Sequence, residues 1–238
     1  MPKAVSEFSR FANQYNQYNM VQEDVAKKLV SGLSRKYYQN IIDFGCGSGG
    51  VYRNIKKQHI SFDSFMALDS SKEMLSIHPS DTKVKKIHAN FNSSEAYQKI
   101  NFKKETILIS SSALQWSEDL DFTFSHLASL TKSAYFAIFT SGTFHTLHLT
   151  AGTVSPIYTK ERLRETIERY YDATFMVKSY RLEFKTVSDM FKYIKKSGVN
   201  GGDKQLDYKQ VKKLMHDYPL NYLEFEVLFV RATSLTKE

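Results

Sequence analysis

Short apolar runs alternate along this chain with longer segments in which apolar residues recur at every third or fourth position. Runs of the first kind predict buried strands, and segments of the second kind predict amphipathic helices. The strands are predicted at 41–44, 65–68, 84–89, 106–109, 135–139, within 174–184 and at 222–231. Helical segments separate most of these strands, so the pattern predicts a doubly wound α/β sheet with helices on both faces.

The predicted helices lie at 21–33, 51–59, 72–77, 120–130, 187–196 and 208–216. Before them, the segment 6–19 places Phe8, Phe11 and Tyr15 on one helical face. This aromatic segment either covers a face of the sheet or closes over a ligand. The segment 146–165 contains one proline and two short amphipathic pieces, and it interrupts the alternation of strands and helices.

A glycine-rich segment, Gly45-Cys46-Gly47-Ser48-Gly49-Gly50, directly follows the first strand. Glycine adopts positive φ easily and lets the backbone approach a ligand closely. A strand that ends in such a loop and continues as a helix is typical of a nucleotide-binding turn. Asp69 follows the next strand, 19 residues after Gly50. This spacing predicts a carboxylate at the neighbouring strand tip, where it can hold a ribose diol.

Two ligands fit this loop. Residues 45–50 match the Gly-x-Gly-x-x-Gly pattern of dinucleotide sites, and residues 43–49 match the Asp-x-Gly-x-Gly-x-Gly pattern of S-adenosylmethionine (SAM) sites. Asp43 favours SAM, because a carboxylate there can accept from the methionyl ammonium but repels a pyrophosphate. The helical residues before the first strand also favour SAM, because dinucleotide-binding domains usually begin with that strand. The Tyr-x-x-x-Lys pair of reductases occurs only as Tyr52 and Lys56, on the helix behind the loop, where it could not reach a substrate. A dinucleotide site, and a loop without a ligand, remain the alternatives.

Length and charge narrow the class of protein. The 238 residues suit one α/β domain with an added segment. The chain has no run of eighteen apolar residues and no apolar signal core at its amino terminus, so we expect a soluble, cytoplasmic protein. The net charge is +8, from 33 Lys and Arg against 25 Asp and Glu, and the pI is about 9.3. This balance favours an acidic partner, either a nucleic acid or an acidic protein.

Cysteine and histidine give little sign of metal or disulfide chemistry. Cys46 is the only cysteine, which excludes an internal disulfide and a multi-cysteine metal site. Inside the glycine loop we expect it to be a small packing residue. His145 and His148 lie three residues apart without an acidic residue nearby in sequence, so we expect no metal site.

Two further segments follow strands on the ligand-facing edge of the predicted sheet. Residues 110–116 follow the strand at 106–109, and residues 140–145 follow the strand at 135–139. Ligands of such sheets bind beyond the carboxyl ends of the strands. We therefore expect 110–116 to lie over the reacting group, although Trp116, the only tryptophan, would also be unremarkable as a core residue.

Several longer motifs match one family. They are Phe8-Ser9-Arg10-Phe11-Ala12 with Tyr15 and Gln22, Leu68-Asp69-Ser70-Ser71-Lys72-Glu73-Met74-Leu75, Ala113-Leu114-Gln115-Trp116, Gly142-Thr143-Phe144, Lys195-Lys196-Ser197-Gly198-Val199-Asn200 and Tyr218-Pro219-Leu220-Asn221-Tyr222. With these motifs in this order, the chain resembles the malonyl-acyl-carrier-protein O-methyltransferases of biotin synthesis, within the class I SAM-dependent methyltransferases.

The resemblance implies a seven-stranded, mostly parallel sheet with an antiparallel last strand. It also implies one domain over 1–238, with N-terminal lid helices at 1–37, a SAM-binding half at 38–140 and a substrate-side part at 141–238. The implied reaction is methyl transfer from SAM to the free carboxylate of malonyl-acyl-carrier protein, giving the ester that primes pimeloyl synthesis. The implied protein is a monomer without metal, membrane or nucleic-acid partners.

The resemblance also assigns residues to the site. We expect cofactor contacts from Tyr15, Gln22, Asp43, Gly45, Gly47, Asp69, Ser70, Met74, Asn90, Phe91, Ser110 and Gln115. Because the malonyl carboxylate is already ionised at neutral pH, the reaction needs no general base. The catalytic candidates are therefore donors to the malonyl group: Tyr18, Ser111, Trp116 and His145. The basic residues expected to meet the acidic carrier are Lys160, Arg162, Arg164, Lys192, Lys195 and Lys196.

Two positions depart from the family. Asn90 stands where an acid often lies near the adenine amine, and Thr131-Lys132-Ser133 replaces a Pro-Gly-Gly turn. Three rival functions remain. One is a methyltransferase acting on another small carboxylic acid. Another is a nucleic-acid methyltransferase, although the chain lacks an Asn/Asp-Pro-Pro-Tyr motif. The third is a SAM-fold binding module without catalysis.

Overall fold

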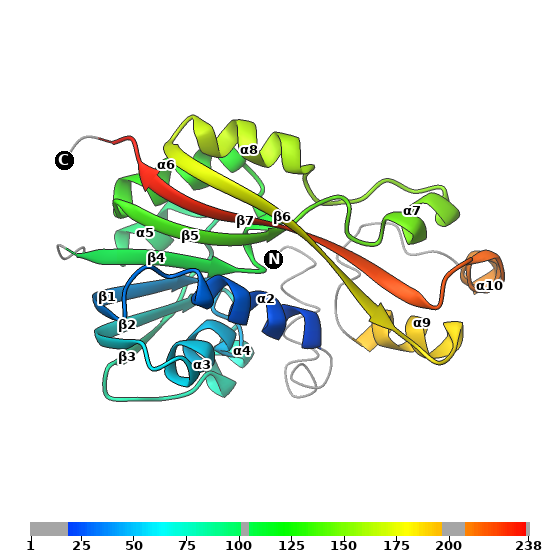
Figure 1. The fold of residues 1–238 in the computed structure, drawn as a ribbon, viewed down its shortest axis with the longest axis horizontal. Helices are drawn as coiled ribbons and strands as arrows, with labels where there is room; N and C mark the ends of the chain where they lie inside the picture. The colour runs from blue at the N-terminus through cyan, green and yellow to red at the C-terminus, as the bar shows by residue number, and fades with distance from the viewer. Residues whose placement is uncertain (1–18, 101–104, 197–207, 237–238) are drawn as a thin grey trace.

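The computed structural model describes residues 19–100, 105–196 and 208–236. Its centre is a seven-stranded sheet in the order β3-β2-β1-β4-β5-β7-β6 (Figure 1). Strands β1 to β5 pair in parallel, and β7 runs antiparallel to both of its neighbours. The predicted α/β sheet with an antiparallel last strand is therefore confirmed. The strands are β1 Tyr37–Phe44, β2 Ser61–Asp69, β3 Val84–His88, β4 Thr106–Ser111, β5 Ser133–Phe139, β6 Tyr171–Glu183 and β7 Tyr222–Ser234.

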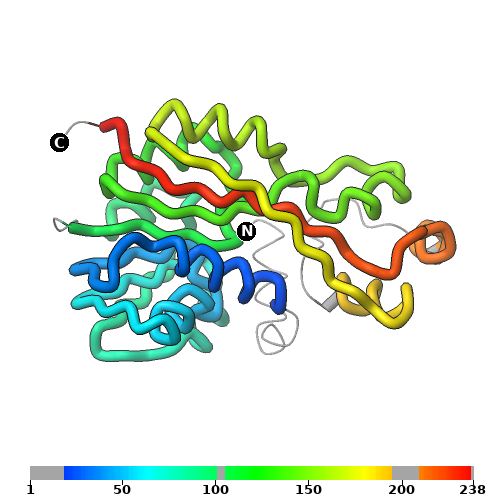
Figure 2. Tube along the Cα trace, viewed as in Figure 1, coloured from blue at the N-terminus to red at the C-terminus, as the bar shows by residue number. Residues whose placement is uncertain are grey.

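Helices cover both faces of the sheet (Figures 1 and 2). Successive side chains of a strand point to opposite faces, so each central strand contributes to two cores. In β1, Ile41 belongs to one hydrophobic core and Ile42 to the other. The first core receives α2 Met20–Ser31, α3 Gly50–Lys57 and α4 Lys72–Ile77, and the second receives α5 Ser94–Gln98, α6 Leu120–Leu130 and α8 Lys160–Glu168.

Strands β6 and β7 extend beyond the rest of the sheet. Each has thirteen residues, and they pair from Tyr171 and Ser234 to Glu183 and Tyr222. Their outer ends carry α7 His145–Ala151, α9 Val187–Lys196 and α10 Tyr208–Asp217 (Figure 1). We call α7, α9, α10 and the ends of β6 and β7 around Glu183 and Tyr222 the distal lobe. It lies on the side toward which the carboxyl ends of β4 and β5 point (Figure 1).

The distal lobe has buried apolar side chains of its own. Leu147, Met190, Leu214, Leu223 and Phe225 are all buried, and they continue the core on the α2 side of the sheet. Burial of such side chains stabilises the lobe by roughly 1.5–3 kcal/mol each. The lobe is thus packed onto the sheet through the β6–β7 pair.

The predicted helices at 72–77, 120–130 and 187–196 have the observed bounds. Two short elements were not predicted, α5 and a 3₁₀ turn, η1 Leu114–Trp116. Both are too short for a helical repeat of apolar residues to be recognised in the sequence. The predicted helix at 6–19 lies outside the described residues except for Asn19, which stands directly before α2. Within those residues, every helix is too short or too polar to cross a membrane.

Candidate functional site

The glycine loop between β1 and α3 lies against the ends of β2 and β4. The N–H groups of Gly45 and Cys46 both donate to the Leu68 carbonyl, at 2.8 and 2.9 Å. Gly45 has a φ of 69°, and a Cβ at this position would lie 2.2 Å from the Cβ of Ala113. Both the backbone conformation and this contact exclude a side chain at position 45. The loop therefore passes directly beside the turn that follows β4.

Asp69, at the end of β2, orders this loop. Its Oδ2 accepts from the Gly47 N–H and its Oδ1 from the Ser71 N–H, each at 2.8 Å. Burial raises the pKa of Asp69, while the N–H groups of Ser71, Gly47 and Ser70 oppose that rise. A carboxylate oxygen can accept more than one hydrogen bond. Asp69 therefore keeps acceptor capacity for the two hydroxyls of a ribose.

Asp43 and Ser110 lie behind the loop rather than on a pocket wall. Asp43 is fully buried, and neither carboxylate oxygen has a hydrogen-bond partner among the described residues. Burial, and then the charge of Asp69, raise the pKa of Asp43 well above its usual value. The Ser110 hydroxyl donates to the Phe44 carbonyl at 2.7 Å. The hydroxyl of Ser110 is thus bonded inside the sheet, and the predicted contact of Ser110 with the cofactor stays a prediction.

A pocket opens in front of the loop, at the carboxyl ends of β1, β2, β3 and β4. The structure brings ten of the predicted residues together on its walls: Gln22, Gly45, Gly47, Asp69, Ser70, Met74, Asn90, Phe91, Ser111 and Trp116. Their roles in binding remain predictions. Tyr15 and Tyr18 lie outside the described residues.

Helix α2 forms one wall of the pocket and is tied to the glycine loop. Glu23 accepts from Arg53 at 3.1 Å and from Asn54 at 3.0 Å. The same Arg53 donates to the Ser48 carbonyl at 2.6 Å. Gln22 lines the pocket from this helix, so the network holds the predicted lid residue beside the loop.

Hydroxyl groups mark the other end of the pocket. Ser111 and Ser112 follow β4, and both line the pocket. Their buried Oγ atoms have no hydrogen-bond partner among the described residues. Leaving a buried hydroxyl unbonded costs free energy, which a polar ligand group can recover. This end of the pocket is therefore suited to an acceptor molecule with oxygen atoms.

Besides Asp43 and Ser110, two predicted residues do not line this pocket. Gln115 is buried, and its amide donates to the Ser112 carbonyl at 2.8 Å. His145 is exposed at the first position of α7, in the distal lobe. The Gln115 amide group donates inside its own turn and the His145 side chain faces solvent, and their contacts with cofactor and substrate stay predictions.

Sequence reasoning also missed residues that line the pocket, among them Glu23, Asn92 and Ser112. Ser112 could have been predicted, since it is next to the predicted Ser111 in the sequence. Asn92 could have been found as the second residue after Asn90, beyond the end of β3. Glu23 is next to Gln22 on a helix, where neighbouring residues point in different directions.

Cys46 and the acidic residues of the site show no metal-binding arrangement. Cys46 is buried, and burial together with the nearby Asp69 and Asp43 raises the pKa of its thiol well above the usual range. Among the described residues, no group of three or more His, Cys, Asp and Glu side chains is placed to hold a metal ion.

The sequence of the chain is similar to those of several curated proteins. No family model matches the chain. It is 26% identical over 207 residues to a malonyl-[acyl-carrier protein] O-methyltransferase of Bacteroides thetaiotaomicron, covering 84% of this chain and 75% of the relative. It is 31% identical over 155 residues to the Bacillus anthracis protein of the same name, covering 59% of this chain and 54% of that relative. The chain thus spans three quarters of one relative and about half of the other.

Solved structures agree on the fold. The YcgJ protein of Bacillus subtilis gives a TM-score of 0.63 at 10% identity, covering 88% of this chain and 98% of that one. A phosphoethanolamine N-methyltransferase 2 of Haemonchus contortus, crystallised with SAM, gives 0.56 at 14% identity, covering 94% and 57%. The fold is that of the class I SAM-dependent methyltransferases. The residues in and behind this pocket fit SAM, with a bare glycine loop and acceptor capacity on Asp69. Asp43 adds a carboxyl group behind the loop that has no hydrogen-bond partner among the described residues.

Proposed function

We propose that this protein is a methyltransferase and transfers the methyl group of SAM to the free carboxylate of malonyl-acyl-carrier protein. The observation that carries the proposal is the acceptor end of the pocket, where Ser111 and Ser112 present buried hydroxyls beside Trp116. The relatives that carry the malonyl-[acyl-carrier protein] O-methyltransferase name support the same reaction.

In the proposed reaction, the main task of the protein is to position the two reactants. SAM, when bound, supplies an electrophilic methyl group on a sulfonium. The malonyl carboxylate is the nucleophile and is ionised at neutral pH. The two carboxylates that line the pocket, Asp69 and Glu23, are both bonded to neighbouring groups and are not needed as bases. Holding two reactants in line can lower a barrier by roughly 7–11 kcal/mol.

In this proposal the hydroxyls of Ser111 and Ser112 donate to oxygen atoms of the malonyl thioester. Trp116 packs beside the acyl group and limits the depth of the pocket. Asp69 holds the ribose, which sets the position of the sulfonium relative to these hydroxyls. The residues thus bind and orient both partners, and no proton moves during the transfer.

The carrier should bind through basic side chains, but the predicted set does not form one surface. Lys160 pairs with Glu226 at 3.1 Å, Arg162 with Asp121 at 3.9 Å and Lys192 with Asp189 at 3.2 Å. In addition, α8 and α9 lie in different parts of the molecule (Figure 1). The set is therefore revised.

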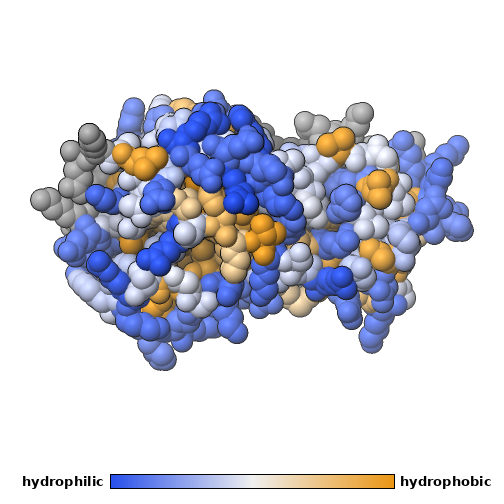
Figure 3. Space-filling view, turned by 45° about the horizontal axis from the view of Figure 1, so that its top comes forward, coloured by the Kyte–Doolittle hydropathy of each residue, from blue (hydrophilic) through white to orange (hydrophobic). Residues whose placement is uncertain are grey.

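Helix α10 offers a better surface for an acidic carrier. Lys209, Lys212 and Lys213 are exposed at helical spacing on this helix. Hydrophilic side chains cover much of the distal lobe at the right of Figure 3. We propose that these lysines meet the carrier. Replacing all three by Gln should slow methylation of the carrier-bound substrate and weaken its salt dependence, because the screening length falls to about 3 Å at 1 M salt. Equal rates and salt responses in both proteins would contradict this assignment, and malonyl-CoA is the control substrate.

The function itself is tested by mass spectrometry of malonyl-acyl-carrier protein after incubation with SAM and the enzyme. We expect the malonyl group to gain one methyl. Acetyl-acyl-carrier protein, which has no free carboxylate, is the matched control and should stay unmodified. Methylation of another carboxylic acid or of nucleic acid, with malonyl-carrier untouched, would overturn the proposal. We further propose that the ester primes biotin synthesis in the cytoplasm, which is tested by rescue of a biotin-requiring strain.

A further inference from the structure

The segment Trp116-Ser117-Glu118 is held from one side by a single amide. The Nδ2 of Asn92 donates to the Trp116 carbonyl at 3.3 Å, and the Oδ1 of Asn92 accepts from the Glu118 N–H at 3.0 Å. One side chain thus binds both ends of the segment. Only a group that carries a donor and an acceptor can do this, and an amide has both.

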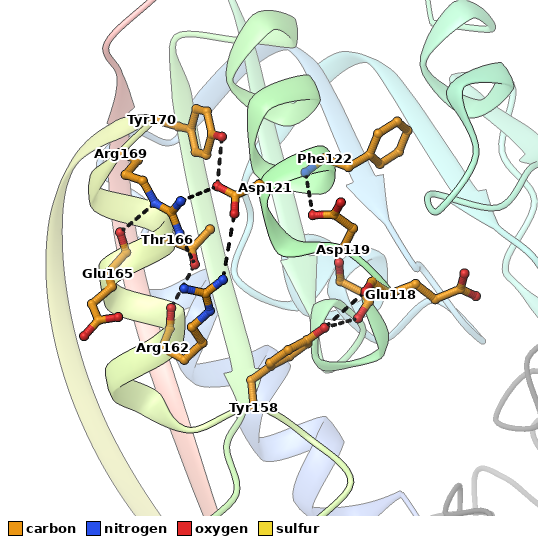
Figure 4. A network of polar contacts seen from close by, with 11 residues as sticks. Glu118, Asp119, Asp121, Phe122, Tyr158, Arg162, Glu165, Thr166, Arg169 and Tyr170 are labelled. Atoms are coloured by element: carbon orange, nitrogen blue, oxygen red, sulfur yellow. Dashed lines mark hydrogen bonds and ion pairs between the residues drawn. The ribbon is translucent and has the colours of Figure 1, made fainter.

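Tyr158 holds the same segment from another direction. Its hydroxyl donates to the Ser117 carbonyl at 2.9 Å and lies 3.4 Å from the Glu118 carbonyl, as Figure 4 shows for Glu118. The Tyr158 carbonyl accepts from the Ser141 N–H at 2.8 Å. Tyr158 therefore joins the segment after η1 to the segment that leaves β5.

Asn92 is also bonded to Asn90, another residue of the pocket wall. The N–H of Asn92 donates to the Oδ1 of Asn90 at 3.0 Å. Both asparagines line the pocket, as does Trp116. A chain of contacts thus runs from Asn90, predicted to lie near the adenine, through Asn92 to the turn that carries Trp116.

We propose that Asn92 and Tyr158 are positioning residues that hold the Trp116 side chain on the pocket wall. The remaining backbone bonds of this turn are local, from the Trp116 N–H to Ala113 and from the Ser117 N–H to Leu114. Local bonds give the turn its shape, and the Ser117 hydroxyl, 2.8 Å from that of Thr123, joins it to α6. Asn92 and Tyr158 add the contacts that place the turn relative to the pocket and to the segment that leaves β5. The inference rests on the proposed function only for the identity of the acceptor.

Three variants of the full chain test this. Asn92→Asp keeps the acceptor for the Glu118 N–H but sets a carboxylate oxygen against the Trp116 carbonyl. Tyr158→Phe removes one hydroxyl and little else. Tyr170→Phe is the matched control, since the Tyr170 hydroxyl donates to Asp121 at 2.9 Å between the same two regions (Figure 4).

The readout is the fluorescence of Trp116, the only tryptophan of the chain. We expect acrylamide to quench this fluorescence more strongly in Asn92→Asp and Tyr158→Phe than in the wild type or in Tyr170→Phe. We also expect kcat/KM for the malonyl carrier to fall about two- to tenfold in Tyr158→Phe, from the loss of one hydrogen bond. The Kd for S-adenosylhomocysteine should change less in this variant.

The inference is overturned if Tyr158→Phe and Tyr170→Phe are quenched equally. It is also overturned if Asn92→Asp, folded as judged by its melting temperature, is quenched like the wild type. The quenching needs no acceptor substrate. If the wild type does not methylate the malonyl carrier, the proposed function fails, while the quenching comparison still decides this inference.

Discussion

The glycine loop and the base of the distal lobe differ in the room that they leave for side chains. At the glycine loop, the N–H groups of Gly45 and Cys46 bind the Leu68 carbonyl, and a Cβ at Gly45 would lie 2.2 Å from the Ala113 Cβ. At the base of the distal lobe, side chains add to backbone bonds such as that from the Thr140 N–H to the Glu226 carbonyl: Glu226 also binds Thr140 and Lys160 through its carboxylate, and Glu224 accepts from the Thr146 N–H at 2.9 Å. Position 45 therefore accepts no side chain, whereas the side-chain contacts at the base of the lobe can be changed one at a time.

The largest effect should come from a side chain in the glycine loop. Gly45→Ala places a Cβ 2.2 Å from the Ala113 Cβ at a φ of 69°. We expect a loss of about 3 kcal/mol or more in the free energy of unfolding, since backbone strain of roughly 1–3 kcal/mol adds to the clash. Thermal and urea unfolding measure it.

The control for this experiment is Gly47→Ala. Gly47 also has a positive φ, of 50°, but a Cβ there would meet nothing within 4 Å. We expect a loss of about 1–2 kcal/mol, the strain of a left-handed alanine alone. Equal losses in the two variants would show that the contact with Ala113 does not constrain the loop.

The next effect concerns Asp69 and SAM. Asp69→Ala removes the predicted ribose acceptor together with the acceptors of the Gly47 and Ser71 N–H groups. Calorimetry should show SAM binding weakened by about 1.5–3 kcal/mol, the scale for a charged hydrogen-bond partner. The exposed Asp172→Ala serves as the control. Unchanged affinity in Asp69→Ala would rule out the ribose assignment.

A smaller effect is expected at the base of the distal lobe. Glu226→Gln keeps an acceptor for Thr140 but removes the charge opposite Lys160, 3.1 Å away. We expect the free energy of unfolding to fall by about 0.5–1 kcal/mol, because both side chains are partly exposed. KM for the acceptor should rise while the Kd for SAM stays constant. A change in SAM binding as large as that in KM would contradict the separation of the two regions, and the exposed Glu168→Gln is the control.

The last effect is a pH dependence from His78, which changes the stability gradually with pH. Its ring is buried, 5.6 Å from the Tyr52 ring centroid, and burial lowers its pKa below 6.5. The unfolded chain therefore binds a proton at higher pH than the folded one. Stability should fall as the pH drops below about 6.5, by at most about 1.4 kcal/mol per pH unit.

The measurement is the melting temperature between pH 7.5 and 5.5. His78→Phe should lose part of this decrease, because phenylalanine binds no proton in either state. His59, an exposed histidine, provides the comparison variant His59→Asn. If wild type and His78→Phe show the same decrease, His78 does not contribute to it.

The sequence predicted the strands and the ligand-facing edge because both depend on local patterns. Apolar runs identify buried strands, and the residues after them must lie at one edge of a parallel sheet. The side-chain directions were harder to predict. Ser110 and Ser111 are neighbours on β4, yet the Ser110 hydroxyl bonds the Phe44 carbonyl inside the sheet, whereas Ser111 lines the pocket. Period-two alternation distinguishes such neighbours only when the faces of the strand are already known.

Other errors came from contacts between distant parts of the chain. The sequence around His145 contains no sign that α7 joins α10 and β7 in a separate lobe. The basic residues of α8 and α9 looked like one set because they share a charge. The acidic partners of the α8 residues, Glu226 and Asp121, come from other elements, whereas Lys192 pairs with Asp189 within α9. Such pairings depend on the folded chain and are invisible to a local pattern.

The position of β7 has a consequence for synthesis on the ribosome. β7 lies between β5 and β6, although it follows both in the chain. As the chain emerges, residues 171–183 are complete before residues 222–234 exist, so β6 has no strand beside it in the sheet order until β7 arrives. The strands around the glycine loop can form earlier, because each of β2 to β5 pairs with a strand made before it. The nascent protein should therefore form its glycine loop first and its distal lobe last. Between these two stages, β6 has no neighbouring strand to pair with.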